Sequence, residues 1–101
     1  MRDKYGIRYL PIAQDDLISI FDHIAGDSAS RVAGFVNKLD KRIGSLRIQP
    51  LMGRIPRNEK LKAIGYRVLI IESYFVFYLL RDHIIEIHRV IHGSRNLDDL
   101  V

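Results

Sequence analysis

The chain has 101 residues, 48% of them hydrophobic, which suffices for a single domain over residues 1–101 but leaves no room for a second core. It contains no cysteine, which excludes disulfides and thiolate metal sites and suits a reducing cytoplasm. The net charge of +4 favours acidic partners, and without a signal-like segment or an apolar run near the roughly 20 residues that span a bilayer we expect a cytoplasmic protein and no membrane association.

The amino-terminal half predicts a short strand and two helices. Alternation of apolar and polar residues from Tyr5 to Leu10 is typical of a strand. From Ala13 to Gly26 the apolar residues recur at helical spacing, with acidic residues in the first turn. A second helix, capped by Asp27 or Ser28, continues towards Pro50. Because few residues join the two helices, we expect an antiparallel hairpin packed against a sheet.

The positive charge is concentrated in the middle of the chain. Between Lys38 and Arg67 there are nine basic and two acidic residues, a local net charge of +7, whereas the remainder carries −3. This distribution is typical of an electrostatic footprint for phosphates or an acidic peptide, and a solvated helix face followed by a basic loop gives the same pattern. Within it, residues from Leu51 to Ala63 have loop composition and no helical or strand period.

The last third predicts three antiparallel strands joined by tight turns at Glu72-Ser73 and Arg81-Asp82-His83. The strands are Gly65–Ile71, Tyr74–Leu80 and Ile84–His92. In the last of them Ile85 and Ile87 share a face whereas Val90 falls on the other. Either both faces are partly buried or a bulge lies near His88 and Arg89.

Asn96 to Val101 has the pattern of a short terminal helix, with Asn96 as its cap. The predicted fold class is therefore α+β. A short amino-terminal strand is followed by an antiparallel helix hairpin, an antiparallel three-stranded meander and this terminal helix.

The motifs argue against metal and cofactor chemistry. His88 and His92 stand four residues apart, which in a strand is about 13 Å and too far for two ligands of one ion. No phosphate-cradling glycine loop is present, and Ser94 lacks the context of a nucleophile elbow. We expect neither a metal nor a cofactor.

The remaining Arg, Lys, His and Glu residues suffice to cleave RNA, because its 2′-hydroxyl is an internal nucleophile. In that hypothesis Glu59 or His92 transfers protons, while Arg67 and Arg95 hold the phosphate. The alternative is that Arg67 is a solvent-facing strand residue and His92 merely ends the sheet.

Several patterns in this order resemble the RelE/ParE superfamily of bacterial toxins from type II toxin-antitoxin modules, over nearly the whole chain. They are Ala13-x-x-Asp16-Leu17-x-x-Ile20-x-x-x-Ile24, Gly53 after Pro50, Tyr66-Arg67-Val68-Leu69, Tyr74-x-Val76-x-Tyr78 and Arg89-Val90-Ile91-His92-Gly93-Ser94-Arg95. The predicted order of elements is similar to the fold of that superfamily.

The resemblance implies a growth-inhibiting toxin, held inactive in a hetero-oligomer with a cognate antitoxin. Acidic residues of the antitoxin would be attracted to the basic segment, and Arg54, Arg57, Lys60 and Lys62 are the candidates for binding it or a nucleic acid.

Two branches of the superfamily imply different targets. In the RNA-cleaving branch, a metal-independent endonuclease that acts on mRNA at the translating ribosome, the catalytic positions match Glu59, Arg67, His92 and Arg95. That branch usually has an Arg where this chain has Phe75, and an aromatic Tyr where it has Gly93 or Val101. The residues around Gly93 are more similar to the ParE branch, which acts on DNA gyrase. We favour a gyrase inhibitor; the alternatives are the endonuclease and a decayed module that retains only antitoxin binding.

Overall fold

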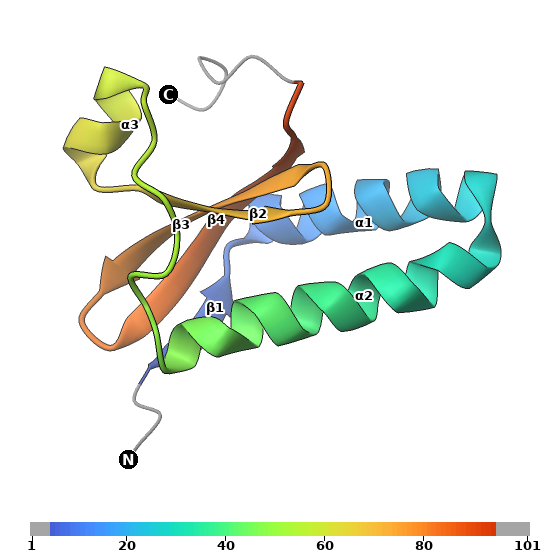
Figure 1. Ribbon diagram of the computed structural model, residues 1–101, viewed down its shortest axis with the longest axis horizontal. Helices are drawn as coiled ribbons and strands as arrows, with labels where there is room; N and C mark the ends of the chain where they lie inside the picture. Colours follow the sequence, from blue (N-terminus) through green and yellow to red (C-terminus); the bar gives the residue numbers. More distant parts are fainter. Residues whose placement is uncertain (1–4, 95–101) are drawn as a thin grey trace.

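The structure is a computed structural model that describes residues 5–94 (Figure 1). In chain order it contains β1 (Gly6–Tyr9), α1 (Pro11–Asp27), α2 (Ala29–Gly44), the 3-10 helix η1 (Ser45–Arg47), α3 (Glu59–Ile64), β2 (Arg67–Ile71), β3 (Tyr74–Arg81) and β4 (Ile84–His92). The α+β class and the order of strand, helix hairpin and antiparallel strands are confirmed. The expected terminal helix from Asn96 to Val101 lies outside the described residues.

The four strands form one mixed sheet in the order β1-β4-β3-β2. β2, β3 and β4 are the predicted antiparallel meander, and β1 pairs in parallel with β4. Both hairpin turns contain a residue with positive φ, Glu72 at 54° and Asp82 at 56°, as tight two-residue turns require. Arg81, expected in the second turn, is the last residue of β3.

A bulge in β4 resolves the change of face seen in the sequence. Phe77 of β3 pairs with Arg89, whereas the next residue, Tyr78, pairs with Ile87, so His88 is the extra residue. Both faces of the sheet are also apolar, so the two explanations hold together. The bulge returns Val90 to the face that carries Ile87.

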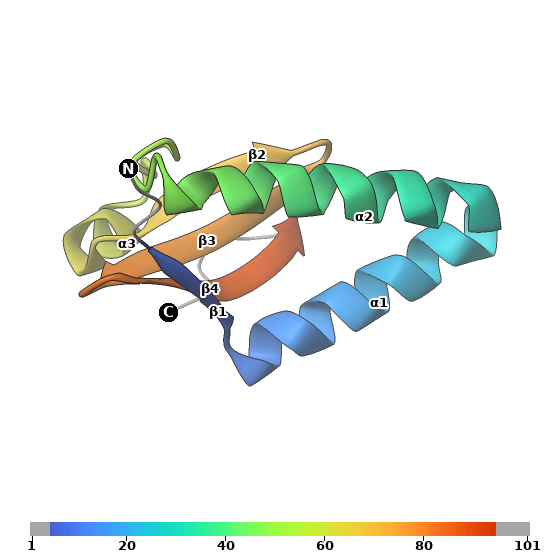
Figure 2. The same ribbon diagram turned by 90° about the horizontal axis from the view of Figure 1, so that it is seen from below.

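The helix hairpin covers one face of the sheet and forms the main core. α1 contributes Ala13, Ile20 and Ile24, and α2 contributes Phe35, Leu39 and Ile43. The helices meet at a joint that projects beyond the sheet and diverge from it towards the sheet (Figure 2). α1 begins at Pro11 rather than Ala13, because proline is favoured in the first turn, where its missing N–H leaves no bond unmade.

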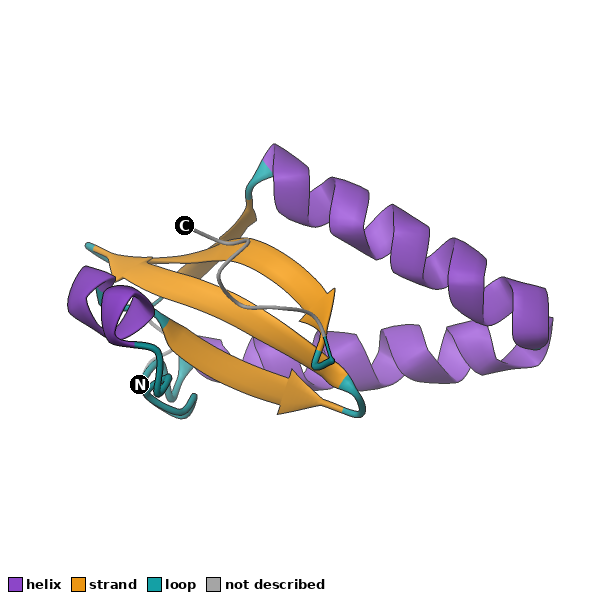
Figure 3. Ribbon diagram, turned by 90° about the horizontal axis from the view of Figure 1, so that it is seen from above, coloured by secondary structure: helices purple, strands orange, loops and turns teal. Residues whose placement is uncertain are grey.

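We call the face of the sheet turned away from α1 and α2 the outer face. It carries a second apolar cluster, made up of Leu61 of α3 with Val68, Phe77 and Ile91 of the strands. α3 lies at one end of the sheet, away from the hairpin (Figure 3).

The prediction of an unstructured segment from Leu51 to Ala63 is wrong at α3. The Asn58 side chain caps this helix by accepting a hydrogen bond from the Leu61 N–H at 3.1 Å. Gly65, with φ of 105°, ends it in the left-handed conformation that glycine adopts without strain. Six residues are too few to show a helical period, so only these two end signals could have indicated the helix.

Candidate functional site

Arg67 lies at the start of β2 and fastens the loop that precedes α3. Its Nη1 donates hydrogen bonds to the carbonyl oxygens of Leu51, at 3.1 Å, and Gly53, at 2.9 Å. The fully buried Tyr78 contributes a hydroxyl that donates to the Pro50 carbonyl at 2.8 Å and accepts from the Gly53 N–H at 2.9 Å. We call residues 50–57 the clasped loop, because these two side chains hold its backbone.

Burial raises the pKa of the Tyr78 hydroxyl, which keeps it protonated as a hydrogen-bond donor. The clasped loop also extends the sheet, since the backbones of Arg54 and Val68 exchange two hydrogen bonds of 2.8 Å at the outer edge of β2. The shape of this loop is therefore set by contacts at several points of its backbone.

His92 lies at the other end of the sheet, as the last residue of β4. Its Nδ1 lies 2.8 Å from the Ser94 hydroxyl and accepts a hydrogen bond from the Ser94 N–H at 3.1 Å, and its ring meets that of Tyr74 edge-on. The imidazole borders an open cavity of about 340 Å³, which Asp16 and His23 of α1 also line. The Asp16 carboxylate accepts hydrogen bonds from Arg89 and from the Val90 N–H.

The residues predicted to cleave RNA do not converge. Arg67 pairs with Tyr78 on β3 and His92 is level with Tyr74, so the two are separated by four residues, or about 13 Å along the strand. Glu59 is the exposed first residue of α3, where the positive end of the helix dipole stabilises its negative charge. α3 itself packs on the outer face of the sheet. Arg95 lies outside the described residues. The three that the structure describes belong to three different places.

The residues predicted to bind an antitoxin or a nucleic acid are closer together. Arg54 and Arg57 line a groove of about 360 Å³ between the clasped loop and the outer face. Lys60 and Lys62 are exposed on α3, which follows the loop directly. The predicted basic segment thus presents part of its charge beside an apolar groove.

Asp16 completes the sheet where β1 ends. The pairing of β1 with β4 stops at Tyr9 and Ile87, because the chain then enters α1. Beyond that point the Asp16 carboxylate accepts the Val90 N–H at 2.9 Å and both Nε and Nη2 of Arg89, at 2.8 and 3.0 Å. A helix side chain thus takes over the role of the missing strand at this edge.

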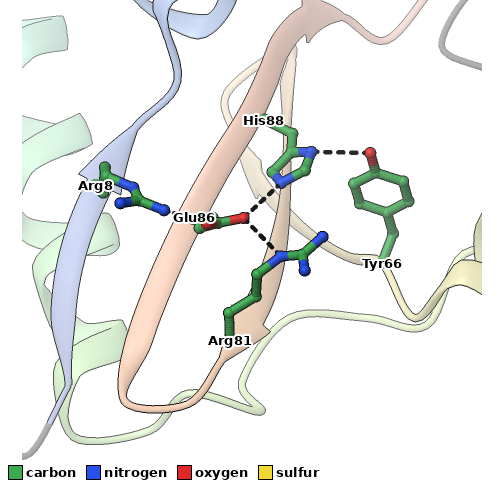
Figure 4. A network of polar contacts seen from close by, with 5 residues as sticks. All are labelled: Arg8, Tyr66, Arg81, Glu86 and His88. Atoms are coloured by element: carbon green, nitrogen blue, oxygen red, sulfur yellow. Dashed lines mark hydrogen bonds and ion pairs between the residues drawn. The ribbon is translucent and has the colours of Figure 1, made fainter.

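Glu86 is the one buried charged residue in the part of the chain that the structure describes. It bonds Arg8 of β1 through Oε2, and its Oε1 accepts from Arg81 Nε at 3.0 Å and His88 Nε2 at 3.1 Å (Figure 4). The hydrogen bond from His88, followed by that from Arg8, holds the pKa of this carboxyl below its ordinary value despite its burial.

This polar network continues to the segment after α3, since His88 Nδ1 lies 2.9 Å from the Tyr66 hydroxyl (Figure 4). Its members come from β1, β3, β4 and the joint that leads into β2. The two Glu86 oxygens accept three hydrogen bonds from within the fold. The network therefore connects elements of the fold.

Sequence reasoning assigned no role to Tyr78 or Glu86 and placed Asp16 in the first turn of its helix, but the helix begins at Pro11 and its first turn holds no acidic residue. Asp16 and Tyr78 stood in the patterns that carry the resemblance, but nothing in their spacing indicates their partners. Glu86 interrupts an apolar strand, and an isolated acid in such a run is the signal that could have drawn attention to it. Within residues 5–94, no three His, Cys, Asp or Glu side chains form a group suited to a metal ion.

The chain is similar to known toxins in sequence and in fold. The family described as "ParE toxin of type II toxin-antitoxin system, parDE" matches residues 7–97. The solved structure titled "Chromosomal ParDE TA system from P. aeruginosa" has a TM-score of 0.73 at 18% identity, covering 90% of this chain and 98% of that one. No curated protein matches the chain, and none of the helices within residues 5–94 is long and apolar enough to span a membrane. The chain belongs to the ParE toxin family of type II toxin-antitoxin systems.

Proposed function

We propose that this chain inhibits growth by acting on DNA gyrase and that its cognate antitoxin neutralises it. Family membership supports the toxin role, and the resemblance of its carboxyl-terminal pattern to the ParE branch supports gyrase as the target. The observation that carries the choice between gyrase and RNA is the dispersal of the three predicted nuclease residues that the structure describes. Arg67 holds loop carbonyls, His92 lies about 13 Å away along the strands, and Glu59 is on α3.

Metal-independent cleavage of RNA needs an acid, a base and a phosphate ligand within hydrogen-bond reach of one phosphodiester. The separation of about 13 Å along the strands between Arg67 and His92 argues against their acting on one phosphodiester, and Glu59 lies on α3. Phe75, at the position where the RNA-cleaving branch usually has an Arg, instead lines the apolar groove beside Ile70. A toxin that inhibits a protein target by binding to it does not need an acid, a base and a phosphate ligand in one place.

The test combines growth arrest with two purified assays. The wild-type chain is expected to inhibit supercoiling by gyrase and to leave mRNA on translating ribosomes intact. The double variant Glu59→Ala, His92→Ala changes two exposed side chains, so it should fold, arrest growth and inhibit gyrase as the wild type does. Loss of growth arrest in this variant with an unchanged melting temperature, or cleavage of ribosome-bound mRNA by the wild type, would contradict the gyrase proposal.

A further inference from the structure

β1 is at one edge of the sheet, and among residues 5–94 no strand lies beyond it. The N–H groups of Gly6 and Leu10 point to the β4 side, where they bond carbonyl oxygens at 2.8 and 3.0 Å. Because N–H groups point alternately to the two sides of a strand, those of Ile7 and Tyr9 point away from β4. Neither has a hydrogen-bond partner within the described residues. This edge can therefore accept another strand.

The edge has little of the protection that keeps other strands away. A charged side chain on an edge strand usually prevents pairing with another chain. The charged residue of β1 is Arg8, and its guanidinium is already paired with the buried Glu86 carboxylate (Figure 4). Only the short length of β1, four residues, limits pairing. A partner strand therefore needs further contacts beside the edge.

The remaining parts of the chain are too short to pair along this edge. Ile7 pairs with Ile85, and β4 then runs for seven more residues, or about 20 Å. Gly93 bonds a carbonyl of the turn between β2 and β3, on the side away from β1. The seven residues after Ser94 can extend about 25 Å, all of which would be needed to reach Ile7. Of the four residues before Tyr5, a hairpin turn would take two, and the other two would not reach Ile7.

Beside this edge, the end of the second helix presents a carboxylate and a guanidinium. Asp40 of α2 and Arg47 of η1 line an open cavity of about 320 Å³ together with Ile7 and Tyr9 of β1. Both charged side chains are exposed, and neither has a hydrogen bond or ion pair in the part of the chain that the structure describes. Burial, and after it the Asp40 charge, raises the pKa of the Tyr9 hydroxyl, whereas the Arg47 charge lowers it. Two charges of opposite sign therefore stand near the edge strand.

These two charges have the arrangement that a two-fold interface requires. When two identical copies meet across a two-fold axis, each residue contacts the counterpart of its own partner. Asp40 and Arg47 are seven residues apart, about two helical turns, and they line the same cavity. A second copy turned by 180° can place its Arg47 against Asp40 and its Asp40 against Arg47. One such contact gives two ion pairs.

The strand edge is self-complementary in the same way. Two copies of β1 related by a two-fold axis perpendicular to the sheet run antiparallel. A register centred on Ile7 joins it to the partner's Ile7 by two N–H···O bonds and sets Gly6 opposite the partner's Arg8. A register centred on Arg8 would set two arginines opposite each other, which is unfavourable. The symmetry therefore favours the register centred on Ile7.

We propose that this chain forms a two-fold symmetric dimer in which β1 pairs with β1 of a second copy and Asp40 pairs with the partner's Arg47. The two four-stranded sheets then join into one. A second copy fits better than an unrelated strand, because it matches the strand edge and the pair of charges at once. This dimer depends neither on gyrase being the target nor on where the antitoxin binds.

The experiment measures self-association of the full chain by sedimentation velocity. Because the interface is small, the wild type should pass from monomer to dimer between about 1 μM and about 1 mM. Asp40→Arg and Arg47→Asp each replace two ion pairs by two contacts of like charge and should weaken association about tenfold or more. The double variant Asp40→Arg, Arg47→Asp restores the opposite charges in exchanged positions, so its dissociation constant should lie within about threefold of the wild type. Arg31→Asp, an exposed position at the other end of α2, is the matched control and should leave association unchanged.

Hydrogen exchange tests the strand pairing independently. Exchange of the Ile7 and Tyr9 amides should become slower as the protein concentration rises, whereas the Gly6 and Leu10 amides, which already bond within the chain, should not change. Melting curves establish that each variant is folded. A wild type that stays monomeric at about 1 mM, single reversals that leave the affinity unchanged, or a double variant as weak as the single ones would overturn the proposal. So would an Ile7 amide that is protected only after the antitoxin is added.

Discussion

At the scale of one residue, Arg67 shows that a side chain can bind a partner only with the hydrogen-bonding groups that the fold leaves unused. Its place in the first strand of the meander was predicted correctly, although β2 begins at Arg67 rather than at Gly65. Its guanidinium nonetheless donates to two loop carbonyls, and the Tyr78 hydroxyl bonds the same loop. A basic residue in a motif therefore identifies a position, while its partners decide what it does.

Gly53 is required at its position by the ring beneath it. A Cβ there would lie 2.6 Å from the Tyr78 hydroxyl oxygen and 2.8 Å from Cε1, and the buried ring has no space into which to move. We expect Gly53→Ala to lower the free energy of unfolding by about 1–3 kcal/mol, the range for overpacking a filled interior. Urea unfolding followed by circular dichroism measures the change.

The matched control is Gly34→Ala, an exposed position in α2 where an added Cβ meets no atom within 4 Å. It should raise the free energy of unfolding by up to about 1 kcal/mol, because alanine is the better helix former. Equal effects of the two substitutions would show that Tyr78 does not confine the clasped loop as described.

At the scale of elements, the longest periodic patterns were the most informative. The hairpin α1–α2 and the meander β2–β4 follow from spacing and turn residues alone, and the bulge follows from the change of face at Val90. The parallel pairing of β1 with β4 could not be predicted from the sequence, because no local pattern relates residues that are 78 positions apart, such as Gly6 and Ile84. The basic residues Arg54 and Arg57 beside the groove were predicted as binding candidates. The apolar residues that line it depend on which strand residues α3 leaves uncovered, which the sequence alone does not indicate.

Asp16 joins two of these elements, and its removal should loosen the edge of β4. In Asp16→Ala the Val90 N–H and the Arg89 guanidinium lose their shared acceptor in a partly buried site. We expect the free energy of unfolding to fall by about 2 kcal/mol, within the range for hydrogen bonds to charged groups. Hydrogen exchange of the Val90 amide should become faster than that of amides in β3.

The control is Asp15→Ala, which removes the neighbouring exposed carboxylate of the same helix. Its effect should stay within about 0.5 kcal/mol, as for most surface substitutions. An equal decrease in the free energy of unfolding for Asp15→Ala and Asp16→Ala would show that the effect comes from the negative charge on the helix and not from the hydrogen bonds at the edge of β4.

At the scale of the whole molecule, the Glu86 network connects the first and last strands. Arg8 and Glu86 are 78 positions apart in the sequence, and His88 extends the network to Tyr66 after α3. A buried carboxylate is tolerated only while its partners remain in place. Its ionisation should therefore be linked to global unfolding rather than to a local movement.

The pH dependence follows from the sign of the pKa shift. The folded-state pKa of Glu86 lies below its ordinary value of 4.5, so the unfolded chain binds the proton more readily. The contribution to stability is complete well above pH 4.5 and is lost as the pH falls through the lower folded-state pKa. In Glu86→Gln this contribution is absent at every pH.

We therefore expect the difference in unfolding free energy between the wild type and Glu86→Gln to be largest at neutral pH and to shrink as the solution is acidified below pH 4.5. Urea titrations at a series of pH values measure it. Glu72→Gln is the control, because it removes an exposed ion pair with Lys38 that contributes little to stability. A wild-type advantage that persists unchanged well into acid would show that the stabilisation by Glu86 does not depend on its charge, since protonation removes that charge.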